Sequence, residues 1–155
     1  MTEGKSAVES DGAVETGELV RMFVNGQAMS GGSLHGPLAR DGALLGEVRT
    51  AAVYRFWSCR DEFPGIEPVT DGGWCVPGEL YAVDYGVLAA ELLPAEPAEL
   101  ELSVVRLADG RGALSMRFRE NALASGTLRP IPPGVGWRDY LAGVAAGPGL
   151  ADVGP

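Results

Sequence analysis

Hydrophobic residues alternate with polar ones, or gather in short runs, along most of the chain between residues 19 and 118. Short runs rich in β-branched and aromatic side chains are typical of buried or half-buried strands. The segments that fit this description are 19–24, 44–50, 53–58, 73–83, 99–107 and 113–118. The fourth of them is interrupted by Pro77 and Gly78, which favours a bulge or a sharp bend.

The last two segments form the clearest strand pair. In both of them apolar residues recur at every second position, so one face of each strand is apolar. The link between them contains Asp109-Gly110, a strong signal for a hairpin turn. The sequence therefore predicts a mostly antiparallel sheet of about five or six strands.

Helical signals are fewer. Asp84 is placed to cap a helix over residues 85–93, and Pro94 is expected to end it. Segments 34–40 and 137–144 predict a helical turn and a C-terminal helix. Many short strands with few helices favour an α+β, β-rich fold, in which a small curved sheet or barrel carries short flanking helices.

The two ends of the chain differ from this central body. Residues 1–17 lack periodic hydrophobic positions and are expected to form a disordered tail. Residues 143–155 are rich in glycine, proline and alanine and are expected to form a flexible tail. The 155 residues are therefore expected to hold one domain, over residues 18–142.

Charge and cysteine content narrow the class of protein. A net charge of −9 argues against nucleic acid and anionic membranes as partners, because both attract basic surfaces. No apolar run approaches the roughly 20 residues that cross a bilayer, and the N-terminus has no signal-peptide pattern. Cys59 and Cys75 are too few for a disulfide framework, so a cytoplasmic location is expected. With a single histidine, neither a metal nor another cofactor is expected.

The stretch FVNGQAMSGG at 23–32 is the first candidate for chemistry. Asn25-Gly26 stands where a strand ends and is typical of a two-residue hairpin turn. The small, flexible residues after it also allow consecutive backbone N–H groups to point the same way and hold an anion. Spacing alone leaves both interpretations open.

Glu96 is the second candidate. It lies between Pro94 and Pro97, on a corner between a predicted helix and a predicted strand that suits a residue facing a pocket. Partial burial would give its carboxyl group the raised pKa that a general base requires, whereas on the surface it is one acid among 21. His35 borders the glycine-rich loop, but it completes no Ser-His-acid triad.

Several motifs together resemble the γ-glutamylcyclotransferase-like (AIG2-like) superfamily. FVNGQAMSGG is similar to that family's FVYGTL-x-x-G opening, PGELYAV to its GELY-x-V strand, and LLPAEPAEL to its LD-x-x-E-G segment. The run from SGGSLHG to AAVYRF, followed by PGIEPVTDGG, LADG and GVGWRDYL, resembles more closely the C-terminal domain of allophanate hydrolases. The resemblance covers residues 19–142 and places Glu96 at the position of the superfamily's catalytic glutamate.

The resemblance implies a small, curved, mostly antiparallel barrel with a cavity at one end. It makes Glu96 the catalytic acid/base, and it makes the glycine loop the segment whose backbone amides hold the substrate. The implied substrate-binding residues are Val24, Asn25, Gly26, Gln27, Ala28, His35 and Arg55. Asn25 stands where the superfamily has a tyrosine, which removes a hydroxyl group and an aromatic wall from the loop.

Three functions stay open at this point. The first is a cyclotransferase-like lyase or transferase that acts on a small amide or urea-like metabolite bearing a carboxylate, by intramolecular aminolysis or a related C–N cleavage. The second is an N-carboxyurea-type decarboxylase or hydrolase, as in allophanate hydrolases but expected here as a stand-alone protein. The third is a non-catalytic assembly or ligand-binding module, monomeric or homodimeric.

Overall fold

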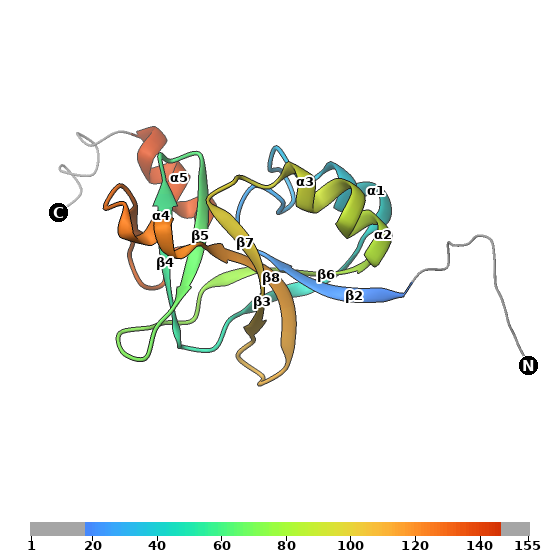
Figure 1. Ribbon diagram of the computed structural model, residues 1–155, viewed down its shortest axis with the longest axis horizontal. Helices are drawn as coiled ribbons and strands as arrows, with labels where there is room; N and C mark the ends of the chain where they lie inside the picture. The colour runs from blue at the N-terminus through green and yellow to red at the C-terminus, as the bar shows by residue number, and fades with distance from the viewer. Residues whose placement is uncertain (1–17, 147–155) are drawn as a thin grey trace, which may run out of the picture.

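The computed structural model describes residues 18–146, arranged as a strand-rich body with short helices around it (Figure 1). The strands are β2 (Leu19–Val24), β3 (Ala43–Arg49), β4 (Tyr54–Cys59), β5 (Phe63–Pro68), β6 (Pro77–Asp84), β7 (Leu100–Arg106), β8 (Gly112–Phe118) and β9 (Arg129–Ile131). The helices are α1 (Gly36–Asp41), α2 (Tyr85–Val87), the π-helical turn η1 (Leu88–Leu92), α3 (Leu93–Ala95), α4 (Glu120–Ala124) and α5 (Trp137–Ala146). These elements confirm the predicted β-rich α+β class.

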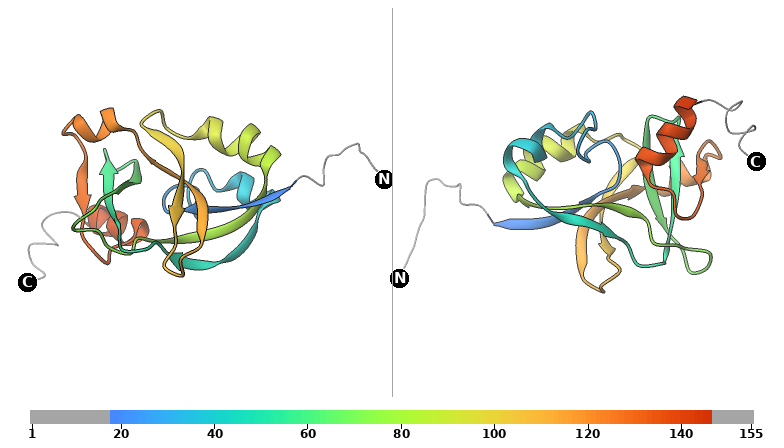
Figure 2. Two further views of the ribbon diagram at one scale, coloured as in Figure 1. Left: turned by 60° about the horizontal axis from the view of Figure 1, so that its bottom comes forward. Right: turned by 180° about the vertical axis from the view of Figure 1, so that it is seen from behind.

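Strand β8 joins the two halves of a single eight-stranded sheet. The strand order is β3-β6-β2-β8-β5-β4-β9, and β7 pairs with β8 along its whole length. Strand β2 meets β8 at Leu114 and β5 meets it at Arg117, both in parallel, whereas the other pairs are antiparallel. The prediction of a mostly antiparallel sheet is therefore confirmed. Figure 2 shows that this sheet curls into part of a barrel, as expected.

The main hydrophobic core lies between this curled sheet and its helices. Its largest fully buried side chains include Phe23, Phe56 and Trp137, from β2, β4 and α5. Burying side chains of this kind contributes about 1.5–3 kcal/mol each. A smaller cluster around Phe63 and Phe118 packs beneath α4. The core therefore ties the C-terminal helix to the first strands of the chain.

The helix after β6 begins as predicted. A side-chain oxygen of Asp84 accepts a hydrogen bond of 2.6 Å from the backbone N–H of Gly86. This N-cap satisfies a donor that the first turn of a helix leaves without a partner.

The same helix does not end at Pro94, and that prediction is wrong. A π-helical turn over Leu88–Leu92 precedes the proline, and Leu93 donates its backbone N–H to the carbonyl of Leu88. Pro94 then lies at the start of α3, where a missing N–H costs no helical hydrogen bond. The chain leaves the helix two residues later than expected, with Glu96 as the C-cap residue.

Two strands and one helix were not predicted, so the expected five or six strands are too few. Strand β5 (FPGIEP) contains two prolines and a glycine, which argue against a strand in the sequence. Pro64 is tolerated because β5 meets its second neighbour, β8, only at Ile66. Strand β9 has three residues and α4 has five, too short for a periodic pattern.

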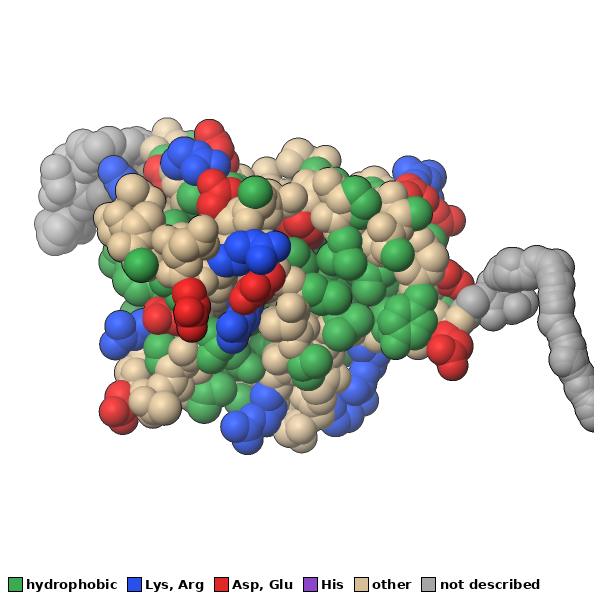
Figure 3. Space-filling view, viewed as in Figure 1, with side chains coloured by type: hydrophobic (Ala, Val, Ile, Leu, Met, Phe, Trp, Pro, Cys, Tyr) green, Lys and Arg blue, Asp and Glu red, His purple; other side chains and the backbone are tan. Residues whose placement is uncertain are grey.

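The Asp109-Gly110 hairpin is confirmed, with Gly110 at a φ of +90° that favours glycine. The apolar face of β7 also exists, but Leu102 and Val104 on it are 41% and 72% exposed. Figure 3 shows hydrophobic side chains gathered on the surface over β2, β8 and the α2–α3 helix. Residues 143–146 of the predicted C-terminal tail belong to α5, and the rest of both predicted tails lies outside the described residues.

Candidate functional site

The glycine loop, residues 25–35, leads from β2 to α1 by successive tight turns. The backbone N–H of Met29 donates to the carbonyl of Gly26 at 3.0 Å, and that of Leu34 donates to the carbonyl of Gln27 at 2.9 Å. Strand β2 pairs with β6 and β8 and not with β3, the next strand in the chain. Asn25-Gly26 is therefore not the turn of a two-residue hairpin, and that interpretation is wrong.

Two positions of this loop require glycine, because neighbouring atoms leave no room for a Cβ atom. A Cβ atom on Gly32 would lie 2.1 Å from the carbonyl oxygen of Gln27. A Cβ atom on Gly26 would lie 2.5 Å from Cδ of Pro64, on the neighbouring strand β5. Both distances are shorter than real Cβ contacts allow, so any other residue here would displace the loop.

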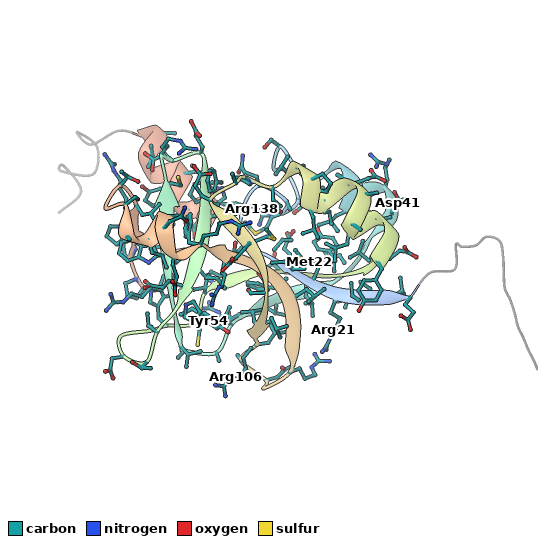
Figure 4. The ribbon with its side chains drawn as sticks, viewed as in Figure 1. Arg21, Met22, Asp41, Tyr54, Arg106 and Arg138 are labelled. Carbon is teal, nitrogen blue, oxygen red and sulfur yellow. The ribbon has the colours of Figure 1, made fainter. Side chains whose placement is uncertain are left out.

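A small cavity brings together the residues that the sequence had selected. It encloses about 30 Å³, enough for one water-sized group, and its walls come from β2, the glycine loop, β5, β7 and β8. Figure 4 labels one of its wall residues, Met22 of β2, which lies under the α2–α3 helix. Of the predicted site residues, those that line this Glu96 cavity are Val24, Asn25, Gly26, Gln27, Ala28 and Glu96.

The carboxyl group of Glu96 changes its protonation state near neutral pH. Burial in this largely apolar setting raises its pKa to about 7. Its backbone N–H donates to the carbonyl of Leu93 at 3.1 Å, which fixes the corner on which the side chain stands. A carboxyl group with this pKa is present in both protonation states at pH 7, so it can both accept and deliver a proton.

Asn25 presents a hydrogen-bond donor that no described residue uses. The residue is 8% exposed, and its Nδ2 atom is buried without a hydrogen-bond partner. Leaving such a donor unpaired in the folded protein costs about 1–3 kcal/mol. Since Asn25 lines the Glu96 cavity, a ligand oxygen placed there would satisfy this donor.

The side chain of Gln27, in contrast, is already engaged. Its Oε1 atom accepts a hydrogen bond of 2.8 Å from Nε1 of Trp137, and its Nε2 atom donates to Oγ of Ser33 at 3.1 Å. These two hydrogen bonds hold the side chain of Gln27 in place between Ser33 and Trp137.

The two other predicted substrate contacts do not line the Glu96 cavity. His35 lies behind the loop, where Nδ1 is 2.9 Å from the carbonyl oxygen of Ala28 and the ring packs 5.8 Å from that of Tyr81. Arg55 is exposed on β4, with its guanidinium over Gly72. The structure thus groups most of the predicted site residues and sets these two apart.

A polar cluster on the far side of the loop was not anticipated. Glu79 of β6 is 3% exposed and is hydrogen-bonded to Ser30, Tyr81 and Arg138. Burial alone would raise its pKa, but these donors outweigh burial and lower it to about 2. The available signal was a glutamate directly before the run LYAV of a predicted strand, because a buried carboxylate needs hydrogen-bond partners.

A second cavity of about 390 Å³ opens beside this cluster. Charged residues from β3, β6 and α5 line it, namely Glu47, Arg49, Glu79, Arg138 and Asp139. Its lining carries both signs of charge, and none of its residues lines the Glu96 cavity. A third cavity, of about 190 Å³, lies between the glycine loop and α5.

The described part of the chain offers little for a metal site, a disulfide or a membrane-spanning helix. Residues 18–146 contain no group of three His, Cys, Asp or Glu side chains arranged to hold a metal. Cys59 and Cys75 form no disulfide. Among the described helices, none has the length and apolar character needed to cross a membrane.

The fold and the Glu96 cavity define a small half-barrel protein with a partly buried carboxyl group, whose pKa is raised, beside a glycine loop. The chain belongs to the family of allophanate hydrolase C-terminal domains, whose family model matches residues 20–142. This membership confirms the resemblance predicted from the sequence. No curated protein matches the chain.

Solved structures with this fold include a uropathogenic Escherichia coli-specific protein. It is 33% identical, with a TM-score of 0.73 over 80% of this chain and 96% of its own. Kluyveromyces lactis allophanate hydrolase is 24% identical with a TM-score of 0.73, over 88% of this chain but 23% of the much longer enzyme. Protein ytfP from Escherichia coli is 25% identical with a TM-score of 0.51, over 74% and 93% of the two chains.

Proposed function

We propose that this protein is an enzyme that acts on a small amide or urea-like molecule bearing a carboxylate, with Glu96 as its acid/base. The observation that carries the proposal is the pairing of two groups in one cavity. Glu96 has a pKa of about 7, and the Nδ2 donor of Asn25 is buried without a partner. The first group moves protons at neutral pH, and the second binds an oxygen that bears or acquires negative charge.

The leading reaction is intramolecular aminolysis. Ionised Glu96 removes a proton from the substrate's amine as the amine nitrogen bonds to the carbonyl carbon of the substrate's own side-chain amide. Nδ2 of Asn25 and the backbone N–H groups of the glycine loop stabilise the resulting oxyanion. Neutral Glu96 then returns the proton to the amide nitrogen as the old C–N bond breaks, so the reaction needs no other reactant.

A second candidate reaction is decarboxylation of an N-carboxyurea, favoured by the family membership. In this reaction the bond between nitrogen and the carboxylate carbon breaks, the electron pair stays on nitrogen, and CO₂ leaves. Neutral Glu96 supplies the proton that nitrogen takes up. His35 and Arg55 do not line the cavity, so the loop amides and Asn25 are the groups available to hold the carboxylate.

The two reactions are separated by assaying the purified protein with γ-glutamyl amino acids and with N-carboxyurea and related ureas. In either case Glu96→Gln should lower turnover by about 10²–10⁴-fold, because it keeps the shape of the side chain but removes the transferable proton. The matched control is Glu91→Gln, which changes an exposed carboxylate on the preceding helical turn and should retain full activity. Wild-type turnover in Glu96→Gln would overturn the assignment.

A thermal-shift screen with small carboxylates, amides and ureas tests the broader claim that the chain binds a metabolite. A ligand that binds only the folded state raises the melting temperature. If no compound of these classes raises it, the protein is better described as an assembly module.

A further inference from the structure

We propose that Glu79, Ser30 and Arg138 form a loop latch that positions the glycine loop for catalysis. The proposal rests on the function proposed above, and it makes these three residues positioning residues, because none of them lines the Glu96 cavity. They come from β6, the glycine loop and α5, so the latch joins three segments that are far apart in the sequence.

The latch requires a carboxylate at position 79. Oε1 of Glu79 accepts from the backbone N–H of Ser30 at 2.8 Å and from the hydroxyl of Tyr81 at 2.9 Å. Oε2 accepts from Oγ of Ser30 at 2.7 Å and from Nη2 of Arg138 at 2.8 Å. Four donors thus converge on one side chain, and only an ionised carboxylate accepts at both ends. A glutamine would direct its own N–H groups at two of these donors.

Arg138 fastens the loop from the other side. Besides Glu79, its Nη2 atom donates to the carbonyl oxygen and to Oγ of Ser30, both at 2.8 Å. The preceding residue, Trp137, is 2% exposed and donates to the side chain of Gln27 at 2.8 Å. The first turn of α5 therefore holds the loop at two points, and the buried indole anchors that turn in the core.

The latch acts on the part of the loop that lines the Glu96 cavity. The residue before Ser30, Met29, donates its backbone N–H to the carbonyl of Gly26, and Leu34 donates to the carbonyl of Gln27. A shift at Ser30 therefore moves the peptide groups of Gly26 and Gln27. Catalytic donors lose much of their effect when they move by about 1 Å, which costs on the order of 100-fold in rate.

The experiment compares Glu79→Gln, Ser30→Ala, Ser30→Thr and Arg138→Lys with the wild type. Glu79→Gln should shift the backbone NMR signals of residues 25–28 and lower kcat by about 100-fold, with a much smaller change in KM. Ser30→Ala should act in the same direction, and Ser30→Thr, which keeps the hydroxyl group, should restore most of the rate. Arg111→Gln removes an exposed ion pair with Asp109 at the distant β7–β8 turn and is the matched control, with unchanged signals and rate.

The NMR signals test the latch without relying on activity, so its failure is distinct from failure of the proposed function. Unchanged signals for residues 25–28 in folded Glu79→Gln would overturn the latch, even if Glu96→Gln is inactive. Shifted signals with wild-type kcat would also overturn it, because the loop would then be held for structure alone. Should Glu79→Gln not fold, Ser30→Ala and Arg138→Lys decide by the same two measurements.

Discussion

Replacing Glu96 by glutamine should remove a pH dependence of stability that the fold imposes on the wild-type protein. Burial raises the pKa of Glu96 to about 7 in the folded chain, whereas a glutamate in an unfolded chain stays near its ordinary value of 4.5. The folded state therefore binds more protons than the unfolded state between about pH 4.5 and pH 7. The free energy of unfolding must fall as the pH rises through this interval.

The size of the effect follows from the two pKa values. A tenfold difference in proton affinity is worth about 1.4 kcal/mol, so ionising Glu96 destabilises the fold by up to about 3 kcal/mol. Glutamine fills the same space without ionising. Glu96→Gln should therefore nearly match the wild type at pH 4, where the wild-type carboxyl group is mostly protonated in both states. At pH 8 it should be more stable by about 3 kcal/mol.

Urea unfolding followed by circular dichroism at pH 4, 6 and 8 measures this difference. Glu91→Gln, the exposed neighbour used above, should keep the wild-type dependence on pH. If Glu96→Gln and the wild type differ by the same amount at all three pH values, the carboxyl group is not buried in a way that perturbs it. Its role as an acid/base at neutral pH would then lose its physical basis.

Three further predictions concern the loop and the helix. Gly26→Val should abolish the thermal shift that any ligand of the screen gives with the wild type, because its Cβ atom would lie 2.5 Å from Cδ of Pro64 and displace the loop. A wild-type shift in folded Gly26→Val would contradict this. Asn25→Tyr should shift substrate preference toward γ-glutamyl compounds by restoring the superfamily's hydroxyl and aromatic wall, as measured by the ratio of kcat/KM values. Asp84→Ala should lower the free energy of unfolding by about 1 kcal/mol through loss of the N-cap to Gly86, without a change in kcat.

Local signals predicted local structure well in this chain. The Asp109-Gly110 turn and the Asp84 cap depend on neighbours in the sequence, and both were visible there. Pro94 shows the limit of such signals: proline ends a regular α-helix, but the π-helical turn before it shifts the hydrogen bonds so that the helix continues to Ala95. Strand β5 was missed because prolines are unfavourable in a strand that is paired on both sides. Only the tertiary arrangement shows that β5 is paired along its length with β4 alone and meets β8 at a single residue.

The residues of the candidate site could also be predicted only in part from the sequence. Glu96 and residues 24–28 were selected because their motifs resemble those of a known family, and they do line one cavity. The positions of His35 and Arg55 depend on how the loop and β4 are oriented, which spacing does not determine. The partners of Glu79 lie 49 and 59 residues away in the chain, so no local pattern reveals that Ser30 and Arg138 converge on it.

The position of β8 between β2 and β5 also determines the order in which the chain can acquire its structure. The β2–β6–β3 and β5–β4 groups precede β8 in the sequence, but in the sheet they meet only through it. On the ribosome, β2 and β5 therefore emerge early and wait with unpaired edges until residues 112–118 have left the exit tunnel. Such non-local pairing slows folding and exposes strand edges to other chains, so the nascent protein should depend on chaperones until β8 is in place.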